Sequence, residues 1–154
     1  MLSELLSPET IAFPLHASRK ESIIEELVGL AVAGGAISHK KEVVQRVRER
    51  EEILSTTVGK GVFIPRVRSR HVSRICLCLG ITRKALDLGA LDGNHVRLCV
   101  FLGIPEGKIE AQVKYLVRIF RLFNQDSFRS ALLKAADKKD VIEIVRSEER
   151  DLER

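Results

Sequence analysis

The sequence predicts a single α/β domain with a central mixed β-sheet flanked by helices. Two stretches with helical spacing of apolar residues open the chain, a cluster of short β-branched and apolar runs fills its middle, and helical spacing returns after Pro105. The 154 residues are enough for one hydrophobic core and too few for two of ordinary size. We therefore expect one domain over residues 1–148 and a charged C-terminal tail over residues 149–154.

The N-terminal third predicts one strand and two helices. A short apolar run over residues 10–15 contains a proline, which favours an edge strand. Ser18 is the expected N-cap of the first helix, which ends at the Gly34-Gly35 pair. A second helix is expected from Ser38, with one apolar face and charged residues on the others. Three valines make this face: Val43, Val44 and Val47.

The middle of the chain predicts the strands. Short β-branched runs over residues 55–58 and 62–64 are separated by Gly59-Lys60-Gly61, which is typical of a tight turn. Longer candidates follow over residues 73–79 and 95–102. The second of these is almost continuously apolar, which indicates a strand buried on both faces.

The last third predicts helices. A wide apolar stripe indicates one long helix, Asp137 is expected to cap the final helix, and that helix is expected to fray from Ser147. The stripe fits core packing and is also wide enough to include a dimer contact. It consists of Ile109, Val113, Leu116, Val117, Phe120 and Phe123.

Composition narrows the class of protein. No apolar run approaches the roughly 20 residues that span a bilayer, and the first eight residues lack the pattern of a secretory signal. We therefore expect a cytoplasmic protein without membrane insertion. Cys76, Cys78 and Cys99 are an odd number of cysteines in apolar runs, which favours small core residues over disulfides or metal ligands. We expect neither a metal nor a cofactor.

The charge pattern argues against a nucleic-acid partner. The formal net charge is +5, but basic and acidic residues alternate along most of the charged segments. Only residues 66–74 are basic without acidic neighbours. The chain has no tryptophan and a single tyrosine, so it offers few platforms on which bases could stack.

Two segments carry a resemblance to a known family. Residues 50–65 combine an Arg-Glu pair, a Ser-Thr pair, a Gly-x-Gly turn and an apolar strand that ends in proline. In residues 85–105 an Asp-Gly turn leads into a buried strand that also ends in proline. Both resemble enzyme IIA domains of the fructose/mannitol and nitrogen-regulatory phosphotransferase family, and the likeness extends over nearly the whole chain. The resemblance implies the fold of that family.

The resemblance also implies an activity and its partners. Family members take a phosphoryl group from a histidine-phosphorylated carrier protein onto a histidine of their own. They pass it to a sugar-transporter subunit, or their phosphorylation state regulates kinases and potassium transporters. The expected partners are therefore proteins: a phosphocarrier-like protein, a kinase or a transporter.

The acceptor position is the point at which this sequence departs from the family. The resemblance places the acceptor histidine directly after Pro65, where this chain has Arg66, and a second histidine of the site at Gln112. A neutral imidazole offers a lone pair to the incoming phosphorus, whereas a guanidinium stays protonated and has no acceptor capacity. We therefore predict a non-phosphorylatable, regulatory relative that binds partner proteins.

The rest of the site resembles the part that holds the phosphate oxygens. Arg50, Ser55 and Thr56 match positions near the family's phosphohistidine, and Arg68 adds charge. Three alternatives to a partner surface stay open. A small anion such as a nucleotide or sugar phosphate could bind there; His71 could be a relocated acceptor, although it lies about 15 Å away along an extended chain; or the arginines could be solvated charges of an inactive site.

Overall fold

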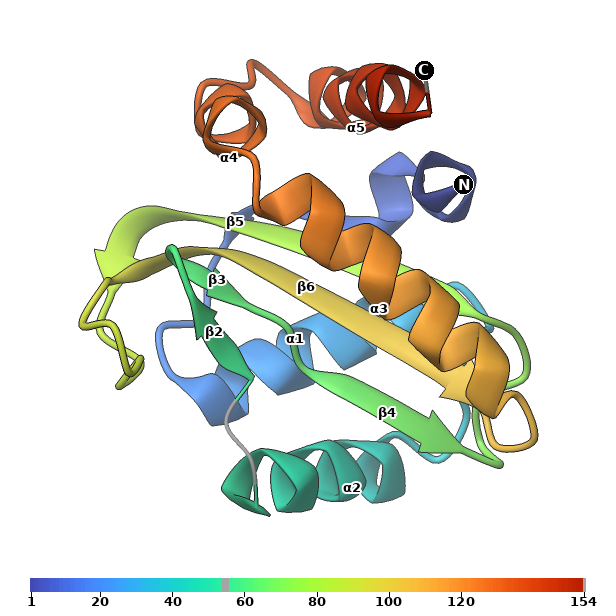
Figure 1. Cartoon of the computed structure of the whole chain (residues 1–154). Helices are drawn as coiled ribbons and strands as arrows, with labels where there is room; N and C mark the ends of the chain where they lie inside the picture. Colours follow the sequence, from blue (N-terminus) through green and yellow to red (C-terminus); the bar gives the residue numbers. More distant parts are fainter. Residues whose placement is uncertain (54–55, 154) are drawn as a thin grey trace.

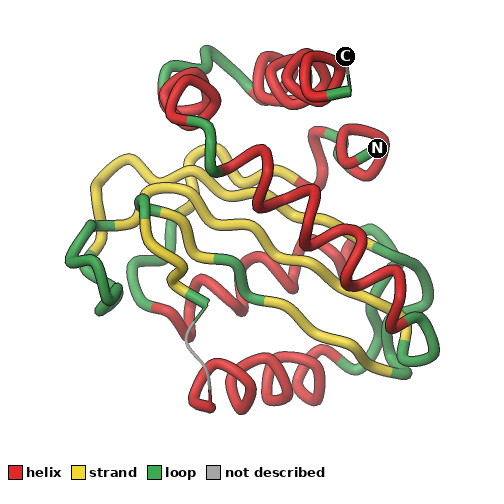
Figure 2. The backbone as a smooth tube through the Cα atoms, in the orientation of Figure 1, coloured by secondary structure: helices red, strands yellow, loops and turns green. Residues whose placement is uncertain are grey.

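A six-stranded mixed sheet lies between two layers of helices (Figures 1 and 2). The computed structural model describes residues 1–53 and 56–153. The strands are β1 (Ile11–Leu15), β2 (Thr57–Gly59), β3 (Val62–Phe63), β4 (Arg66–Ser69), β5 (Cys76–Leu86) and β6 (Val96–Pro105). The helices are α1 (Lys20–Ala33), α2 (Lys40–Ile53), α3 (Ile109–Phe123), α4 (Asp126–Leu133) and α5 (Lys138–Leu152), with 3-10 turns η1 (Leu2–Leu5) and η2 (Pro8–Thr10). The predicted α/β domain with a mixed sheet is confirmed.

The order of the strands sets the position of Arg66. The strand order is β1-β5-β6-β3-β2, and β4 follows β3 along the same side of β6. β3 and β4 both run parallel to β6. Between them Pro65 has no amide hydrogen to donate, but its carbonyl oxygen accepts the Leu102 amide at 3.1 Å. Arg66 is therefore the first residue of a strand that resumes, in line, after a proline.

The sheet is buried on both faces, as the apolar pattern of β6 predicts. Cys99 and Phe101 pack with α1 and α2 on one face, and Val100 and Leu102 pack with α3, α4 and α5 on the other. This alternation follows the two-residue period of a strand. The three cysteines are all buried in the first of these clusters, as predicted. They are Cys76, Cys78 and Cys99.

The start of α1 differs from the expected cap. The helix begins at Lys20 with Arg19 as its N-cap residue, so Ser18 does not take that role. The Arg19 amide donates to Ser22 Oγ at 3.3 Å. Further back, the Ala17 amide donates to a Glu26 carboxylate oxygen at 2.9 Å, which fixes the direction in which the chain enters the helix. Side chains from within the helix therefore supply the acceptors that the sequence pattern assigned to Ser18.

The apolar stripe predicted for α3 is only partly buried. The buried residues of α3 are Ile119, Leu122 and Phe123, all in its C-terminal half. Four residues of the predicted stripe are exposed instead: Ile109, Val113, Val117 and Phe120. The helix crosses the sheet at an angle (Figure 1) and packs most closely through its C-terminal half. Of the two possibilities left open for the stripe, core packing therefore accounts only for its C-terminal part.

The charged tail is also more ordered than the sequence predicts. Helix α5 continues to Leu152 and does not fray from Ser147. Glu149 is buried, and its two carboxylate oxygens accept the amides of Leu2 at 2.7 Å and Ser3 at 2.8 Å. These bonds join the last helix to the first turn of the chain. Within residues 1–53 and 56–153, no helix has the length and apolar character needed to cross a membrane.

Candidate functional site

A cavity of about 320 Å³ opens between α2, β4 and the start of α3. Figure 1 shows β4 at the side of the sheet, between α2 and the N-terminal end of α3. We call this the arginine cavity because four of its lining residues are arginines and only one is acidic. It is lined by Arg46, Glu49, Arg50, Ile53, Arg66, Val67, Arg68 and Gln112.

The local structure explains why these arginines converge. Arg46 and Arg50 are four residues apart on α2, so they share one face of the helix. Arg66 and Arg68 are two residues apart on β4, so they share one face of the strand, while Val67 between them points into the core. Helix α2 and strand β4 each present two guanidinium groups to one space.

Gln112 brings α3 into the site. Its side-chain oxygen accepts a hydrogen bond from Arg68 Nη1 at 3.0 Å. This contact orients Arg68 without neutralising its charge, because an amide oxygen carries no formal charge. Four of the predicted site residues therefore line one cavity. They are Arg50, Arg66, Arg68 and Gln112.

The charge of Arg66 is poorly compensated. Its side chain is partly buried, and its Nε atom is buried without a hydrogen-bond partner in the described part of the chain. Burial lowers the pKa of the Arg66 guanidinium, and the nearby charge of Arg50 lowers the pKa further, whereas Glu51 raises it. A guanidinium stays protonated despite such shifts. Its positive charge is therefore held where water solvates it poorly.

No acidic partner in the described ranges neutralises the cavity. None of its four arginines is within ion-pair distance of a carboxylate among residues 1–53 and 56–153. Glu49 accepts a hydrogen bond from Gln45 Nε2 at 3.1 Å. Glu51 pairs with Lys20 Nζ at 3.1 Å. The cavity therefore carries a net positive charge that favours a bound anion.

Thr56 does not line the arginine cavity, contrary to expectation. It is buried, its hydroxyl donates to Glu51 Oε2 at 2.6 Å, and its amide donates to Glu51 Oε1 at 2.9 Å. Glu51, which the resemblance did not single out, is the acceptor for both donors of Thr56. The neighbouring predicted residue, Ser55, lies outside the residues that the structure describes.

The Gly59-Lys60-Gly61 turn, although it belongs to the segment that carries the family resemblance, does not line the arginine cavity. The Lys60 amide donates to Asp92 Oδ2 at 2.8 Å, so this amide is not available to an anion at Arg66. Both glycines have positive φ, at 94° for Gly59 and 78° for Gly61, which suits the tight turn that was predicted. The turn is therefore part of the scaffold and not of the arginine cavity.

His71 lies past the far end of β4 from Arg66. Its Nε2 is 2.7 Å from Glu42 Oε2, and its ring stacks on His39 with 4.2 Å between ring centroids. His71 does not line the arginine cavity. The structure thus gives His71 a carboxylate and a second imidazole as neighbours, and no arginine of the cavity.

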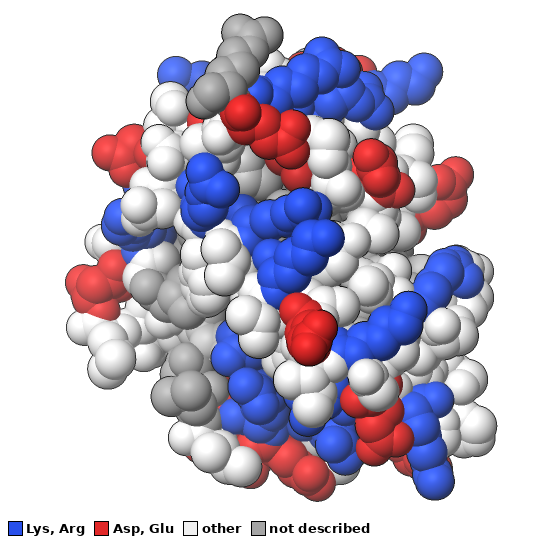
Figure 3. Space-filling model, turned by 45° about the vertical axis from the view of Figure 1, so that its right-hand side comes forward, with Lys and Arg blue, Asp and Glu red and all other residues white. Residues whose placement is uncertain are grey.

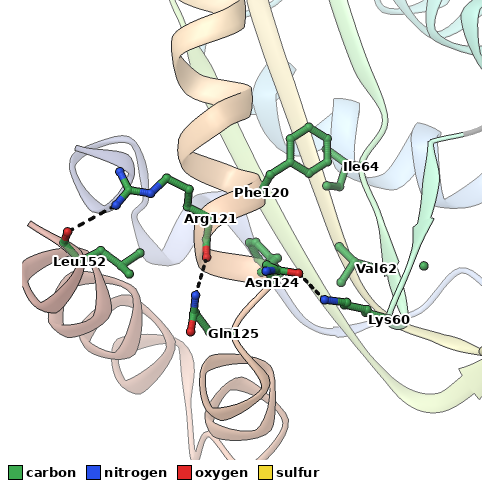
Figure 4. Close-up of a pocket in the computed structure, with 10 residues that line it drawn as sticks. Lys60, Val62, Ile64, Phe120, Arg121, Asn124, Gln125 and Leu152 are labelled. Carbon is green, nitrogen blue, oxygen red and sulfur yellow. Dashed lines mark hydrogen bonds between the residues drawn. The ribbon is translucent and has the colours of Figure 1, made fainter.

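A second and larger cavity, of about 540 Å³, lies at the other end of α3. Figure 4 shows its apolar wall, with Val62, Ile64 and Phe120 on one side. Its polar side chains bond to nearby groups: Lys60 Nζ donates to Asn124 Oδ1, and others pair with main-chain oxygens. Among the described residues, the predicted site residues Arg50, Thr56, Arg66, Arg68, His71 and Gln112 do not line this cavity, whereas Gly59 and Lys60 of the turn do.

Exposed apolar side chains occur on two of the elements that line the arginine cavity, α2 and α3. Ile53 is 86% exposed at its edge, and Ile109 and Val113, on either side of Gln112 in α3, are 56% and 59% exposed. We call these three residues the apolar rim. Figure 3 shows the molecule turned so that the right-hand side of Figure 1 comes forward; Lys and Arg are spread over this face among uncharged residues, with separate Asp and Glu side chains between them. Charge and apolar surface are thus combined on one face.

The fold is that of enzyme IIA proteins. The crystal structure of nitrogen regulatory protein IIA-Ntr from Neisseria meningitidis superposes with a TM-score of 0.85, at 26% identity, over 93% of this chain and 97% of that chain. Enzyme IIA of the mannitol system from Escherichia coli, solved in complex with phosphorylated enzyme IIB, gives a TM-score of 0.79 over 92% of this chain and 97% of that chain. Its identity of 18% shows likeness of fold alone.

Sequence comparison identifies the family. The chain is 26% identical over 144 residues to the fructose-specific EIIABC component of the Bacillus subtilis (strain 168) phosphotransferase system. This match covers 94% of the chain and 23% of that longer protein. Residues 4–148 match the family described as phosphoenolpyruvate-dependent sugar phosphotransferase system, EIIA 2, and the chain belongs to this family.

Proposed function

We propose that this chain is a regulatory enzyme IIA protein that accepts no phosphoryl group at Arg66 and binds a protein partner through the arginine cavity and the apolar rim. The observation that supports the proposal is the partly buried guanidinium of Arg66, which has an unpaired Nε and no carboxylate partner in the described ranges. By resemblance, it occupies the acceptor position of the family.

The chemistry of the guanidinium supports the loss of transfer. Phosphoryl transfer to nitrogen needs a lone pair, and the nitrogens of a protonated guanidinium have none to offer. Gln112, where the resemblance places a second histidine, is bonded to Arg68 at 3.0 Å. Its amide is a hydrogen-bonding group and not a nucleophile. The site keeps cations and has lost both expected imidazoles.

The apolar rim supports a protein as the partner. A small anion would leave Ile53, Ile109 and Val113 in water, whereas a protein surface would cover them. Helix α3 has 15 residues and extends for about 22 Å, which is long enough to form one side of an interface of ordinary size. We propose a phosphocarrier-like protein, a kinase or a transporter as the partner, and a cytoplasmic location for the interaction.

A labelling experiment tests this function. The chain is incubated with a histidine-phosphorylated carrier protein that bears radioactive phosphate, beside a histidine-containing enzyme IIA protein as positive control. We expect label on the control and none on this chain. Acid-labile label on this chain would refute the proposal, and repeating the assay with His71→Ala would show whether His71 had accepted it.

Restoring the acceptor gives the complementary test. Arg66→His, alone and combined with Gln112→His, supplies the imidazoles that the resemblance implies. We expect the double variant to take up label, because a neutral imidazole then stands beside Arg50 and Arg68. A circular dichroism spectrum and melting curve like those of the parent chain show that the variant is folded.

A further inference from the structure

We propose that the larger cavity, at the C-terminal end of α3, binds a small aromatic carboxylic acid. We call it the hairpin cavity, because Lys60 in the turn between β2 and β3 is one of its lining residues. It shares no lining residue with the arginine cavity. The inference is therefore independent of the proposed function, and it adds a separate ligand site to the chain.

The size and the walls of the hairpin cavity suit a ligand with an apolar body. Its volume of about 540 Å³ falls within the roughly 300–1,000 Å³ that is usual for small-molecule sites. Val62, Ile64 and Phe120 form the apolar wall that Figure 4 shows. Val62 and Ile64 are buried, whereas Phe120 is 39% exposed. An aromatic ligand that packs on the Phe120 ring would remove both rings from water.

The charged side chains that line the hairpin cavity are cationic. They are Lys60 and Arg121, and no Asp or Glu of the described ranges lines it. Neither cation is within ion-pair distance of a carboxylate among residues 1–53 and 56–153. Lys60 Nζ donates to Asn124 Oδ1, and Arg121 Nη2 donates to the Leu152 main-chain oxygen at 3.5 Å (Figure 4). Both acceptors are formally neutral, so the cavity retains its positive charge and favours an anion.

The amount of charge favours one carboxylate over a phosphate. Lys60 reaches the C-cap residue of α3, and Arg121 reaches the last residue of α5. The C-terminal end of a helix carries about half a negative charge. Two such ends offset about one of the two positive charges. The remaining charge matches a monoanion, whereas a phosphate group would bring nearly two negative charges.

The backbone of the turn does not account for a lysine at position 60. Lys60 has a φ of 57°, in the left-handed region that glycine and asparagine adopt more readily than lysine. Its amide donates to Asp92 Oδ2 at 2.8 Å, a contact that any residue except proline can make. The feature that only lysine supplies here is the side chain that extends to Asn124. We therefore assign this side chain to the ligand.

Lys60 and Asn124 together can hold a carboxylate. Asn124 uses its side-chain oxygen to accept from Lys60, so its side-chain N–H groups can donate to an anion. The ammonium of Lys60 has three N–H groups, of which this contact uses one. A carboxylate has two oxygens and can accept from the ammonium and the amide at the same time. The aromatic body of the same ligand would then cover Phe120.

Matched small molecules test this inference. 2-Naphthylacetate, its neutral amide 2-naphthylacetamide, and acetate are titrated into the ¹⁵N-labelled chain and followed by NMR. We expect the acid to bind with a Kd below about 1 mM, the amide to bind at least about fivefold more weakly because it brings no charge, and acetate to bind more weakly than the acid because it has no apolar body. The acid should shift the amide signals of Lys60, Asn124 and Gln125, and not those of Arg66 and Arg68.

Matched variants locate the site. Lys60→Asn suits the left-handed backbone and removes the charge, so it should reduce the preference for the acid over the amide to less than about twofold. Phe120→Ala should weaken both ligands at least about fivefold, because each packs on the ring. Lys114→Gln removes the same charge from an exposed residue of α3 that does not line the hairpin cavity, and it should leave both affinities unchanged. Melting curves of the three variants show that they are folded.

Several outcomes would overturn the inference. A Kd above about 1 mM for the acid would show that the cavity is not a site for this class of ligand. An amide that binds within about fivefold of the acid would show a site for apolar molecules in general. A preference lowered equally in Lys60→Asn and Lys114→Gln would show an effect of net charge alone. Shifts confined to residues of the arginine cavity would place the acid there. No phosphoryl transfer is involved, so these results are independent of the labelling assay that tests the proposed function.

Discussion

Glu149 offers a quantitative test of how the two ends of the chain are joined. It is 7% exposed, and its carboxylate accepts the amides of Leu2 at 2.7 Å and Ser3 at 2.8 Å. Glu149→Ala removes both acceptors and leaves two amides of a 3-10 turn unpaired in the interior. A hydrogen bond to a charged group contributes about 1.5–3 kcal/mol, and these two share one carboxylate, so we expect a total loss of about 3 kcal/mol.

The loss is large enough to measure by thermal unfolding. For a chain of this size, each kcal/mol shifts the Tm by about 2–4 °C, so the Tm should fall by about 6–12 °C. Glu148→Ala is the matched control: it is the preceding residue on α5, and its side chain has no hydrogen bond within the described ranges, so the Tm should change by less than about 2 °C. Equal shifts in the two variants would refute the role assigned to Glu149. Faster hydrogen exchange at Leu2 and Ser3 should accompany the lower Tm.

The remaining predictions concern the interior and the start of α5. Burial raises the pKa of Cys76 from 9.0 to about 11 and that of Cys99 to about 12, and it raises the pKa of Cys78 further still. A thiol reagent at neutral pH should therefore react with these three cysteines only after the chain is unfolded in guanidinium chloride. The unfolded thiols ionise first, so stability should fall as pH rises above about 9, which a pH series of urea unfolding curves checks. Gly103→Ala would place a Cβ 2.6 Å from Cys76 Sγ and should destabilise by about 1–3 kcal/mol in urea unfolding; Cys76→Ala in the same chain should recover part of that loss. Asp137→Ala removes an acceptor 2.8 Å from an amide of the first turn of α5 and should lower the free energy of unfolding by about 1 kcal/mol, whereas Asp137→Asn should retain most of it.

The sheet and its two helical layers were predictable because their signals are local. Period-two and period-3.6 patterns depend on residues close together in the sequence, and they correctly indicated β6, α1 and α2. The predictions that were wrong depend on particular side-chain hydrogen bonds, one local and one between distant residues, that such patterns do not show. In α1, acceptors from within the helix replace the expected cap at Ser18. Helix α5 stays helical to its end because Glu149 accepts hydrogen bonds from the amides of Ser3 and Leu2, which are 146 and 147 positions away in the sequence.

The depth to which each turn of α3 is buried could not be predicted, for a related reason. An apolar stripe shows which face of a helix is suited to burial, but not how closely each turn approaches the sheet. Ile119 and Leu122 are buried at the C-terminal half, whereas Ile109 and Val113 at the start of the helix stay exposed. The sequence left both core packing and an intermolecular contact open for this stripe, and in the structure the apolar residues of its first half are exposed.

The arginine cavity was predictable in part. Arg66, Arg68 and Gln112 come together as the resemblance implies, but Thr56 does not, because Glu51 accepts both its amide and its hydroxyl. A sequence names potential donors without showing which acceptor each one reaches. Arg46 was missed, although a signal existed: it lies four residues before Arg50 on a predicted helix and therefore shares its face.

The position of Arg66, Arg68 and Arg70 has a consequence for solubility. In the described part of the sheet, β4 pairs with β6 along one side, so the main-chain groups along its other side are not joined to a strand. A free strand edge is a place where a second chain can add and begin aggregation, and long charged side chains along such a strand discourage that addition. Replacing all three arginines with apolar residues would therefore promote precipitation in addition to removing charge from the arginine cavity, and single substitutions separate the two effects.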